Sequence, residues 1–338
     1  MNMSEVWQEW QRMQWMSLQR QFLYVKHLSP FYREKFRDIS DVRTPDDWRD
    51  VPVTRKQELT AAYENDPDIF GGRLCIREKD LAYAHDIHDP YSPHPPLMVG
   101  YSLTDKENVV RYLVDAFRAM DIANGEVMQV QGFNNEALSN FCILNISGTG
   151  SYSSPTVTDL MGLQTVGLDI SPREARRTYH TAKLLKPETI LTNVRHLRAL
   201  QTLLEQHGER LGDLRYQKVV LRIQEDDEEH PLAETRQQLI RQGVDEVYYL
   251  LYVPEALLFA TECAYQDGFH FPEEEFFLEV TSEDGQALPV GEWGTLTITN
   301  LFHAATPLLR YQTRFQAKSQ PEPSRCGGLA FRRGGGFA

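Results

Sequence analysis

Histidines and aspartates, two residue types that bind metal ions, are concentrated in one short stretch at residues 85–96. The stretch contains His85, Asp86, His88, Asp89 and His94. Its four prolines remove backbone donors and fix the chain angle, so we expect a loop. Such a loop could bind a metal ion, but a solvated loop explains the same residues without one.

The sequence does not indicate a catalytic triad of serine, histidine and aspartate. The G-x-S-x-G turn that presents such a serine is missing from the sequence. Serines that lie near histidines along a chain are not evidence of a triad. We therefore assign no catalytic residue.

The composition is that of an ordinary soluble globular protein, with 41% apolar and 25% charged residues among 338. The formal net charge of −13 disfavours nucleic acid and anionic membranes as partners. The four cysteines lie far apart and predict no disulfide scaffold. No apolar run approaches the ~20 residues of a membrane-spanning helix. We expect a protein of the cytoplasm.

The N-terminal part of the chain is predicted to be helical. Helical spacing extends over residues 4–37 and is interrupted at Ser29-Pro30. Thr54 is predicted to cap a further helix, and Thr104 to open another. We expect the helix with Trp7, Trp10 and Trp15 to pack on the domain rather than bind a ligand. Trp7 and Trp15 cannot share a narrow face with every other apolar residue, so some aromatic surface is expected to remain exposed, which favours a protein partner.

Helices and strands then alternate. Strands are predicted over 127–133, 218–223 and 246–253, and helices over 173–185 and 234–243. Such alternation predicts a layered α/β domain.

Beyond residue 275 the pattern changes to short β runs separated by turn residues, which predicts a small sheet or distorted barrel. We expect α/β subdomains over 1–250, a β-rich subdomain over 251–328 and a flexible tail over 329–338.

Several sequence blocks occur in an order typical of one family. They are LSPFYREKF, DVPVTRKQEL, TECAYQDGFHFPEEEFFLEV, LPVGEWGTLTITNL, TPLLRYQTR and a cysteine–glycine pair. In these blocks the chain resembles phenylacetate–CoA ligase-like members of the adenylate-forming superfamily. The resemblance implies the family's large domain, with two α/β subdomains and a β-barrel-like third. It also implies a reaction that joins a carboxylic acid to AMP and then passes the acyl group to a thiol.

The same resemblance implies an ATP phosphate loop rich in serine, threonine and glycine, because small residues let backbone N–H groups approach the anion. Residues 85–96 take its place, and their carboxylates would repel phosphate. Ser147–Gly150 has suitable residues at another sequence position, where a plain turn is the simpler interpretation.

A Tyr-Gly-x-x-Glu element, whose glutamate helps to place Mg²⁺ in the family, is also altered. Counting back from Glu262-Cys263 aligns its tyrosine with Tyr249 and its glutamate with Val253. Glu255 could serve after a shift in register, although a solvated loop carboxylate is the simpler interpretation.

The family's RY-x-T-x-D pattern grips the ribose through its aspartate. Arg310 and Thr313 match the pattern, but Phe315 replaces the aspartate and cannot accept a hydrogen bond. Glu225 remains from a stretch that lines the adenine and acyl pocket, or belongs to an exposed acidic loop. Tyr249, Glu225, Arg310 and Thr313 are thus expected to outline a vestigial nucleotide and acyl pocket.

Some relatives hold a structural zinc ion through a cysteine, a histidine and a C-x-C-G pair. Cys263, His270 and Cys326 stand at matching places, with Ser324 in place of the fourth ligand. The resemblance therefore implies a possible zinc site with water or a nearby acid as fourth ligand. Two buried cysteines and a surface histidine are the alternative.

Three functions remain open. The chain is either a binding or accessory protein that holds a partner enzyme or a small carboxylic acid, or an inactive subunit beside an active ligase. Alternatively, it is a remodelled ligase or acyl-transfer enzyme. We favour the first two, because the resemblance also implies a C-terminal lid domain that we expect this chain to lack, and because ATP and Mg²⁺ binding need the replaced residues. A dimer is expected from the family.

Overall fold

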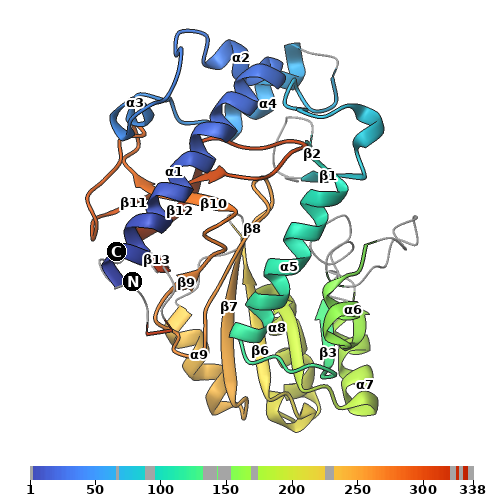
Figure 1. The fold of residues 1–338 in the computed structure, drawn as a ribbon. Coiled ribbons are helices and arrows are strands. Elements are labelled where there is room, and N and C mark those ends of the chain that lie inside the picture. The colour runs from blue at the N-terminus through green and yellow to red at the C-terminus, as the bar shows by residue number, and fades with distance from the viewer. Residues whose placement is uncertain are drawn as a thin grey trace.

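A mixed β-sheet of eleven strands runs through the described part of the computed structural model (Figure 1). The structure describes residues 3–65, 68–87, 96–131, 143, 154–168, 174–224, 232–319, 325–326 and 330–333. The strand order is β10-β11-β12-β13-β9-β8-β7-β6-β5-β3-β4, and β1 and β2 form a separate hairpin. The α/β class predicted from the sequence is confirmed.

The helices and strands are distributed along the whole chain. The helices are α1 (Met3–Leu28), α2 (Pro30–Lys35), α3 (Pro45–Arg49), α4 (Lys56–Asn65), α5 (Leu103–Ala119), α6 (Val157–Met161), α7 (Ala175–Leu185), α8 (Val194–Gln206) and α9 (Leu232–Arg241). The strands are β1 (Tyr83–Ile87), β2 (Leu97–Tyr101), β3 (Val127–Gln131), β4 (Gln164–Leu168), β5 (Thr189–Asn193), β6 (Lys218–Ile223), β7 (Glu246–Val253), β8 (Leu258–Thr261), β9 (Phe269–His270), β10 (Phe276–Thr281), β11 (Trp293–Asn300), β12 (Tyr311–Ser319) and β13 (Ala330–Arg333). Short 3₁₀ turns lie at Glu78–Asp80 and Leu211–Leu214.

Five strands, β4, β3, β5, β6 and β7, form the parallel part of the sheet. Every residue of β5 and β6 is buried, as expected for parallel strands whose two faces are both covered by other elements. The sequence shows this as nearly continuous apolar runs in β6 and β7. Helices α7 and α8 pack beside β3 and β5, and α9 packs beside β7.

Strand direction alternates from β7 onward, through β8, β9, β13, β12, β11 and β10. Strand β7 therefore belongs to both parts of the sheet, and the predicted boundary near residue 250 falls inside it. Strand β13 lies between β12 and β9, within the segment for which the sequence predicts a flexible tail. The four residues of β13 each pair with at least one of these strands, and Phe331 pairs with both, which places this part of the segment in the sheet.

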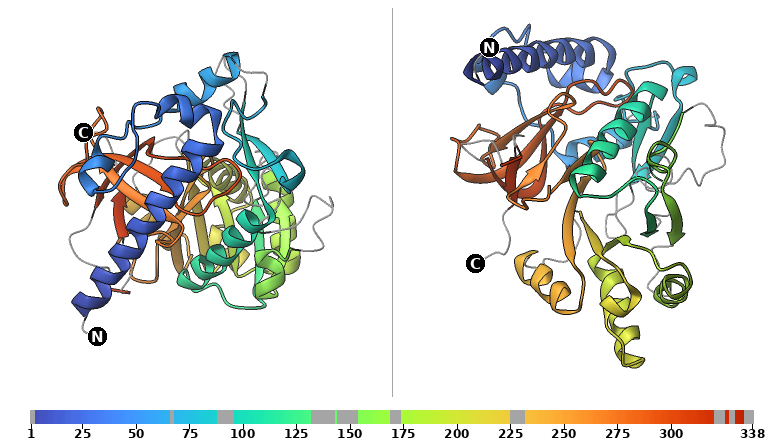
Figure 2. Two further views of the ribbon diagram at one scale, coloured as in Figure 1. Left: turned by 45° about the horizontal axis from the view of Figure 1, so that its top comes forward. Right: turned by 60° about the horizontal axis from the view of Figure 1, so that its bottom comes forward.

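The long helix α1 lies against the C-terminal strands, far away in sequence (Figures 1 and 2). Leu18, Phe22 and Val25 share a core cluster with Leu301 and Leu309. The side chains of Gln21 and Tyr24 donate hydrogen bonds to the carbonyls of His303 and Ala304. None of the helices in the described ranges is long and apolar enough to cross a bilayer.

The predicted interruption at Ser29-Pro30 is confirmed, because Ser29 caps α2 and accepts a hydrogen bond from the Tyr32 amide at 3.2 Å. Two predicted helix starts are wrong. Thr54 does not cap α4: its hydroxyl donates to the Leu309 carbonyl at 2.8 Å, since residue 54 bridges to β12. Thr104 lies inside α5, which Ser102 caps reciprocally with Asp105.

Candidate metal site and candidate nucleotide pocket

Three side chains that can bind a metal ion, two cysteines and a histidine, meet at the junction of β8, β9 and β13. Ligand atoms of Cys263, His270 and Cys326 all lie within 4.8 Å of one another. The Cys326 Sγ is 3.5 Å from His270 Nε2. Cys263 is buried and Cys326 is exposed, so the cluster reaches from the interior to the surface.

The sheet brings these three residues together, although Cys263 and Cys326 lie 63 positions apart in the sequence. Thr261 at the end of β8 pairs with His270 in β9, which places Cys263 two residues beyond that pair. His270 also pairs with Ala330 in β13, shortly after Cys326. Antiparallel pairing therefore fixes the spacing of the donors.

Thiolate and imidazole are the ligands that zinc prefers, and three of them satisfy most of a tetrahedral shell. Asp267 lies beside the cluster, with one carboxylate oxygen 3.9 Å from His270 Nε2. This carboxylate adds negative charge beside the three donors, which favours a cation there. The donor set thus fits a zinc ion, whereas Ser324, the residue predicted in the fourth ligand's place, lies outside the described residues.

A cavity of 470 Å³ opens beside this cluster, between α5 and the strands β8 and β9. Helix α5 contributes Tyr112, Ala116 and Ala119 to one wall, and Phe259 faces them from β8. Cys263, His270 and Cys326 also line the cavity. Its volume lies in the range of small-molecule sites, about 300–1,000 Å³.

Strand β7 and the turn that follows it carry two residues singled out from the sequence, Tyr249 and Glu255. Tyr249 is fully buried, and its hydroxyl donates to the Leu232 carbonyl at 2.6 Å. Burial raises the pKa of this tyrosine. Its backbone amide donates to Glu262, which also pairs with Arg236. Tyr249 is therefore anchored on the side of α9.

Glu255, which the sequence suggested to be a solvated loop carboxylate, is instead 2% exposed. It lies in the turn between β7 and β8, and one carboxylate oxygen, Oε1, is 3.0 Å from Lys56 Nζ. The other oxygen has no hydrogen-bond partner within the described ranges. The correction has a physical cause, because a buried carboxylate needs a cation and α4 supplies one at its first residue.

Arg310 serves the fold. Its guanidinium is 1% exposed and pairs with Glu279, with an Nε–Oε2 distance of 3.2 Å. It also donates to the carbonyls of Val51, Arg49 and Gly285. Burial raises the pKa of Glu279, whereas Arg310 acts to lower it. The arginine thus ties the segment before α4 to β10.

Thr313 and Phe315 lie on β12. The Thr313 hydroxyl donates to the Leu296 carbonyl at 2.8 Å and accepts from the Phe315 amide at 3.1 Å. Phe315 is 3% exposed and belongs to the main apolar core. Where the family pattern has a ribose-binding carboxylate, this chain has a ring packed in the interior.

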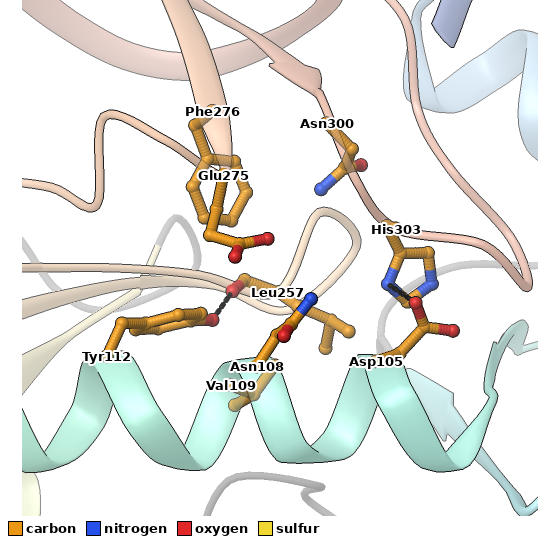
Figure 3. A pocket seen from close by; sticks show the side chains of 9 residues that line it. All are labelled: Asp105, Asn108, Val109, Tyr112, Leu257, Glu275, Phe276, Asn300 and His303. Atoms are coloured by element: carbon orange, nitrogen blue, oxygen red, sulfur yellow. Dashed lines mark hydrogen bonds and ion pairs between the residues drawn. The ribbon is translucent and has the colours of Figure 1, made fainter. Parts of the chain in front are cut away.

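A second, smaller cavity of 20 Å³ lies under α5, enough for a single water molecule (Figure 3). Side chains of α5 point across it toward Glu275, Phe276, Asn300 and His303. His303 Nδ1 is 3.6 Å from Asp105, and its Nε2 is 3.1 Å from the Gly100 carbonyl. His303 thus contacts a carboxylate and a backbone carbonyl of the protein itself, which indicates a structural role.

Sequence reasoning did not identify Lys56, Asp105 or His303. Lys56 belongs to the block DVPVTRKQEL, where it looks like an ordinary surface lysine. Asp105 stands three residues after Ser102, and this capping-box spacing could have identified it. Glu225, Ser147–Gly150 and residues 88–95 lie outside the described residues. The solvated loop expected from residue 85 onward is wrong at its start, because His85 lies in β1 and is buried.

The chain has recognisable relatives. No protein-family model matches it. It is 23% identical over 330 residues to a phenylacetate–coenzyme A ligase of Thermus thermophilus, covering 94% of this chain and 67% of the relative. It is 22% identical over 306 residues to a phenylacetate–coenzyme A ligase of Pseudomonas putida, covering 88% and 63%.

The fold is also found among solved structures. An open conformation of 2-hydroxyisobutyryl-CoA ligase, in complex with 2-HIB-AMP and CoA, matches with a TM-score of 0.77 and 16% identity. The match covers 94% of this chain and 66% of that one. This chain thus spans about two thirds of the length of its relatives. Its sequence is thus similar to phenylacetate–CoA ligases, and its fold is that of the large part of an adenylate-forming ligase.

Proposed function

We propose that this chain is a binding or accessory member of its family that does not form acyl-adenylates by itself. The observation that carries the proposal is the pairing of Glu255 with Lys56 at the end of β7. A carboxylate that coordinates Mg²⁺ beside a nucleotide needs an oxygen free for the metal. Here a lysine ammonium already neutralises the carboxylate, which is 2% exposed.

The ribose side supports the same function. Phe315 cannot accept the hydrogen bonds of ribose hydroxyls, and its ring is packed in the core. Leaving those hydroxyls unpaired in a pocket costs about 1–3 kcal/mol each. Arg310 is already engaged by Glu279 and three carbonyls, so it is not available to a nucleotide.

The proposal includes a zinc ion held by Cys263, His270 and Cys326. When bound, zinc would act as a Lewis acid and as a cross-link between strands. The three residues would connect β8, β9 and the segment before β13, which are otherwise paired over only a few residues. Metal affinity would then contribute to folding stability.

The proposed partner is a protein, either an active ligase or a second copy of this chain, with a small carboxylic acid as ligand. The net charge of −13 argues against nucleic acid and anionic membrane surfaces. Exposed Met13 and Met16 on α1 offer apolar surface for protein contact.

One observation favours a remodelled ligase instead. The second oxygen of Glu255 is buried and has no hydrogen-bond partner within the described residues, which is a costly state that a bound cation would relieve. In that case Mg·ATP would bind through a rearranged set of ligands, with Lys56 turned toward phosphate.

Calorimetric titration of the purified chain with Mg·ATP separates the two functions. No binding at millimolar ATP supports the accessory role, and pull-down from the native source then identifies the partner. Micromolar binding, followed by pyrophosphate exchange with an aromatic or aliphatic acid, would establish the ligase. Lys56→Met serves as the matched variant: if lysine holds the site closed, the variant gains affinity for Mg²⁺.

A further inference from the structure

The 470 Å³ cavity beside the cysteine–histidine cluster has two chemically different ends. Its walls are apolar: Ala116 and Ala119 on α5 are small and leave space, and Tyr112, Phe259 and Phe271 supply aromatic surface. Its other end is formed by Cys263, His270 and Cys326. An apolar body with a metal-binding head group would match both ends.

Within the described residues, three side chains offer ligand atoms at this cluster. Zinc sites with three protein ligands keep a fourth position open for water or a ligand. Because the same three residues line the cavity, that position would face its interior. This step rests on the zinc ion of the proposed function.

Charge around the cavity selects among head groups. Exposed Asp115 and Glu274 line it, with Arg118 3.7 Å from Asp115, and the whole chain carries a net charge of −13. A free carboxylate would meet repulsion there. A thiol approaches as a neutral molecule and loses its proton only when it coordinates a metal ion. Sulfur is also the donor that a metal already bound by two thiolates accepts readily.

We infer that the cavity binds a small apolar thiol whose sulfur completes the metal's coordination shell. In the binding step the metal–water bond breaks, the metal–sulfur bond forms, and the thiol proton passes to solvent. Nothing is oxidised or reduced. The aliphatic or aromatic body lies between α5 and Phe259, where burial of its surface contributes the affinity.

Cobalt(II) substitution tests this inference, because the visible d–d bands of cobalt report its ligands. The apoprotein is loaded with Co²⁺ alone and titrated with phenylmethanethiol, with 3-phenylpropionate as a carboxylate of similar body. We expect the thiol to shift the bands at 1:1 stoichiometry and the carboxylate to leave them unchanged. Ala116→Trp fills the cavity without removing a donor and should weaken thiol binding at least tenfold at unchanged Co²⁺ affinity. Ala61→Trp, at an exposed position on α4, is the matched control.

Each other outcome has a distinct meaning. If Co²⁺ binds and the thiol leaves its bands unchanged, the inference fails while the metal site stands. Equal thiol affinity in the Ala116→Trp protein would also overturn it, because the thiol would then bind outside the cavity. An equal response to the carboxylate would refute the choice of head group. If the unchanged protein does not bind Co²⁺, the metal site itself is wrong and the inference fails with it. The His270→Ala protein, which lacks one donor, is the control that should not bind Co²⁺.

Discussion

Replacement of Arg310 by methionine tests whether this arginine belongs to the fold or to a nucleotide pocket. The change keeps an unbranched chain of similar length and removes the charge. Glu279 would then lie in a site 8% exposed with Trp48 Nε1 as its remaining hydrogen-bond donor. Four backbone carbonyls, those of Trp48, Arg49, Val51 and Gly285, would lose the guanidinium as well.

The magnitude follows from the burial of the pair. Removing one partner of a buried ion pair costs about 3–5 kcal/mol, because an uncompensated charge remains. The free energy of unfolding of an ordinary domain is about 5–15 kcal/mol, so the variant should lose a large share of its stability. Urea unfolding followed by circular dichroism gives the free energy of unfolding by linear extrapolation.

The pH dependence of the loss identifies its cause. Burial raises the pKa of Glu279, and loss of Arg310 would raise it further. A carboxyl whose folded-state pKa lies above its unfolded value stabilises the fold at low pH and loses that contribution as pH rises. The destabilisation should therefore be larger at pH 8 than at pH 5.

Arg37→Met is the matched control, because Arg37 and its partner Glu34 are both largely exposed. We expect less than about 1 kcal/mol there. A loss of less than 1 kcal/mol for Arg310→Met, or a loss that does not vary with pH, would refute the structural role. Arg310 would then be free to act in a ligand pocket.

Three further predictions concern other buried groups. Burial lowers the pKa of His85 to about 3 and that of His196 to about 4, so the unfolded chain takes up more protons below pH 6.5 and stability falls as pH decreases from there. At pH 5 each histidine should cost about 2 kcal/mol relative to neutral pH, and urea unfolding of His85→Phe should show a smaller drop between pH 7 and pH 5 than the unchanged protein. Lys56→Met leaves Glu255 buried without its cation and should destabilise the chain by about 3–5 kcal/mol in the absence of Mg²⁺, with part of the loss recovered in Lys56→Met/Glu255→Gln; an unchanged melting temperature would contradict the pairing. Removal of zinc by a chelator should lower the melting temperature of the unchanged protein, whereas Cys263→Ser should bind less metal and respond less.

The regular elements could be predicted because their signals are local. Continuous apolar runs predicted β6 and β7 with the bounds that the structure gives. The break between α1 and α2 followed from Ser29-Pro30. Strand β13 could not be predicted, because its glycine-rich surroundings indicate a tail and only pairing with β9 and β12 stabilises it.

The candidate pocket residues were harder to interpret, because a sequence motif does not say which groups a side chain meets. Arg310 and Thr313 match a nucleotide-binding pattern, yet their hydrogen bonds go to the backbone and to Glu279. The cysteine–histidine cluster is different. Its three donors meet as the family resemblance implied, because the sheet pairing of β8, β9 and β13 positions them.

The ion pair of Glu255 with Lys56 bears directly on the proposed loss of nucleotide chemistry. A buried carboxylate at the end of β7 is unstable unless a positive charge lies beside it. In a ligase, a divalent cation bound with ATP can supply that charge, and the site is then complete only in the presence of substrate. In this chain Lys56 supplies a permanent charge from α4 at 3.0 Å. The ion pair balances the charge of Glu255 in the turn between β7 and β8 without a bound metal ion. Under the proposed function, an aspartate at position 315 alone would not give nucleotide binding, because Lys56 must also leave the carboxylate. The double variant Lys56→Met/Phe315→Asp should therefore bind Mg·ATP more tightly than Phe315→Asp alone, and equal affinity of the two variants would show that Lys56 does not control the site.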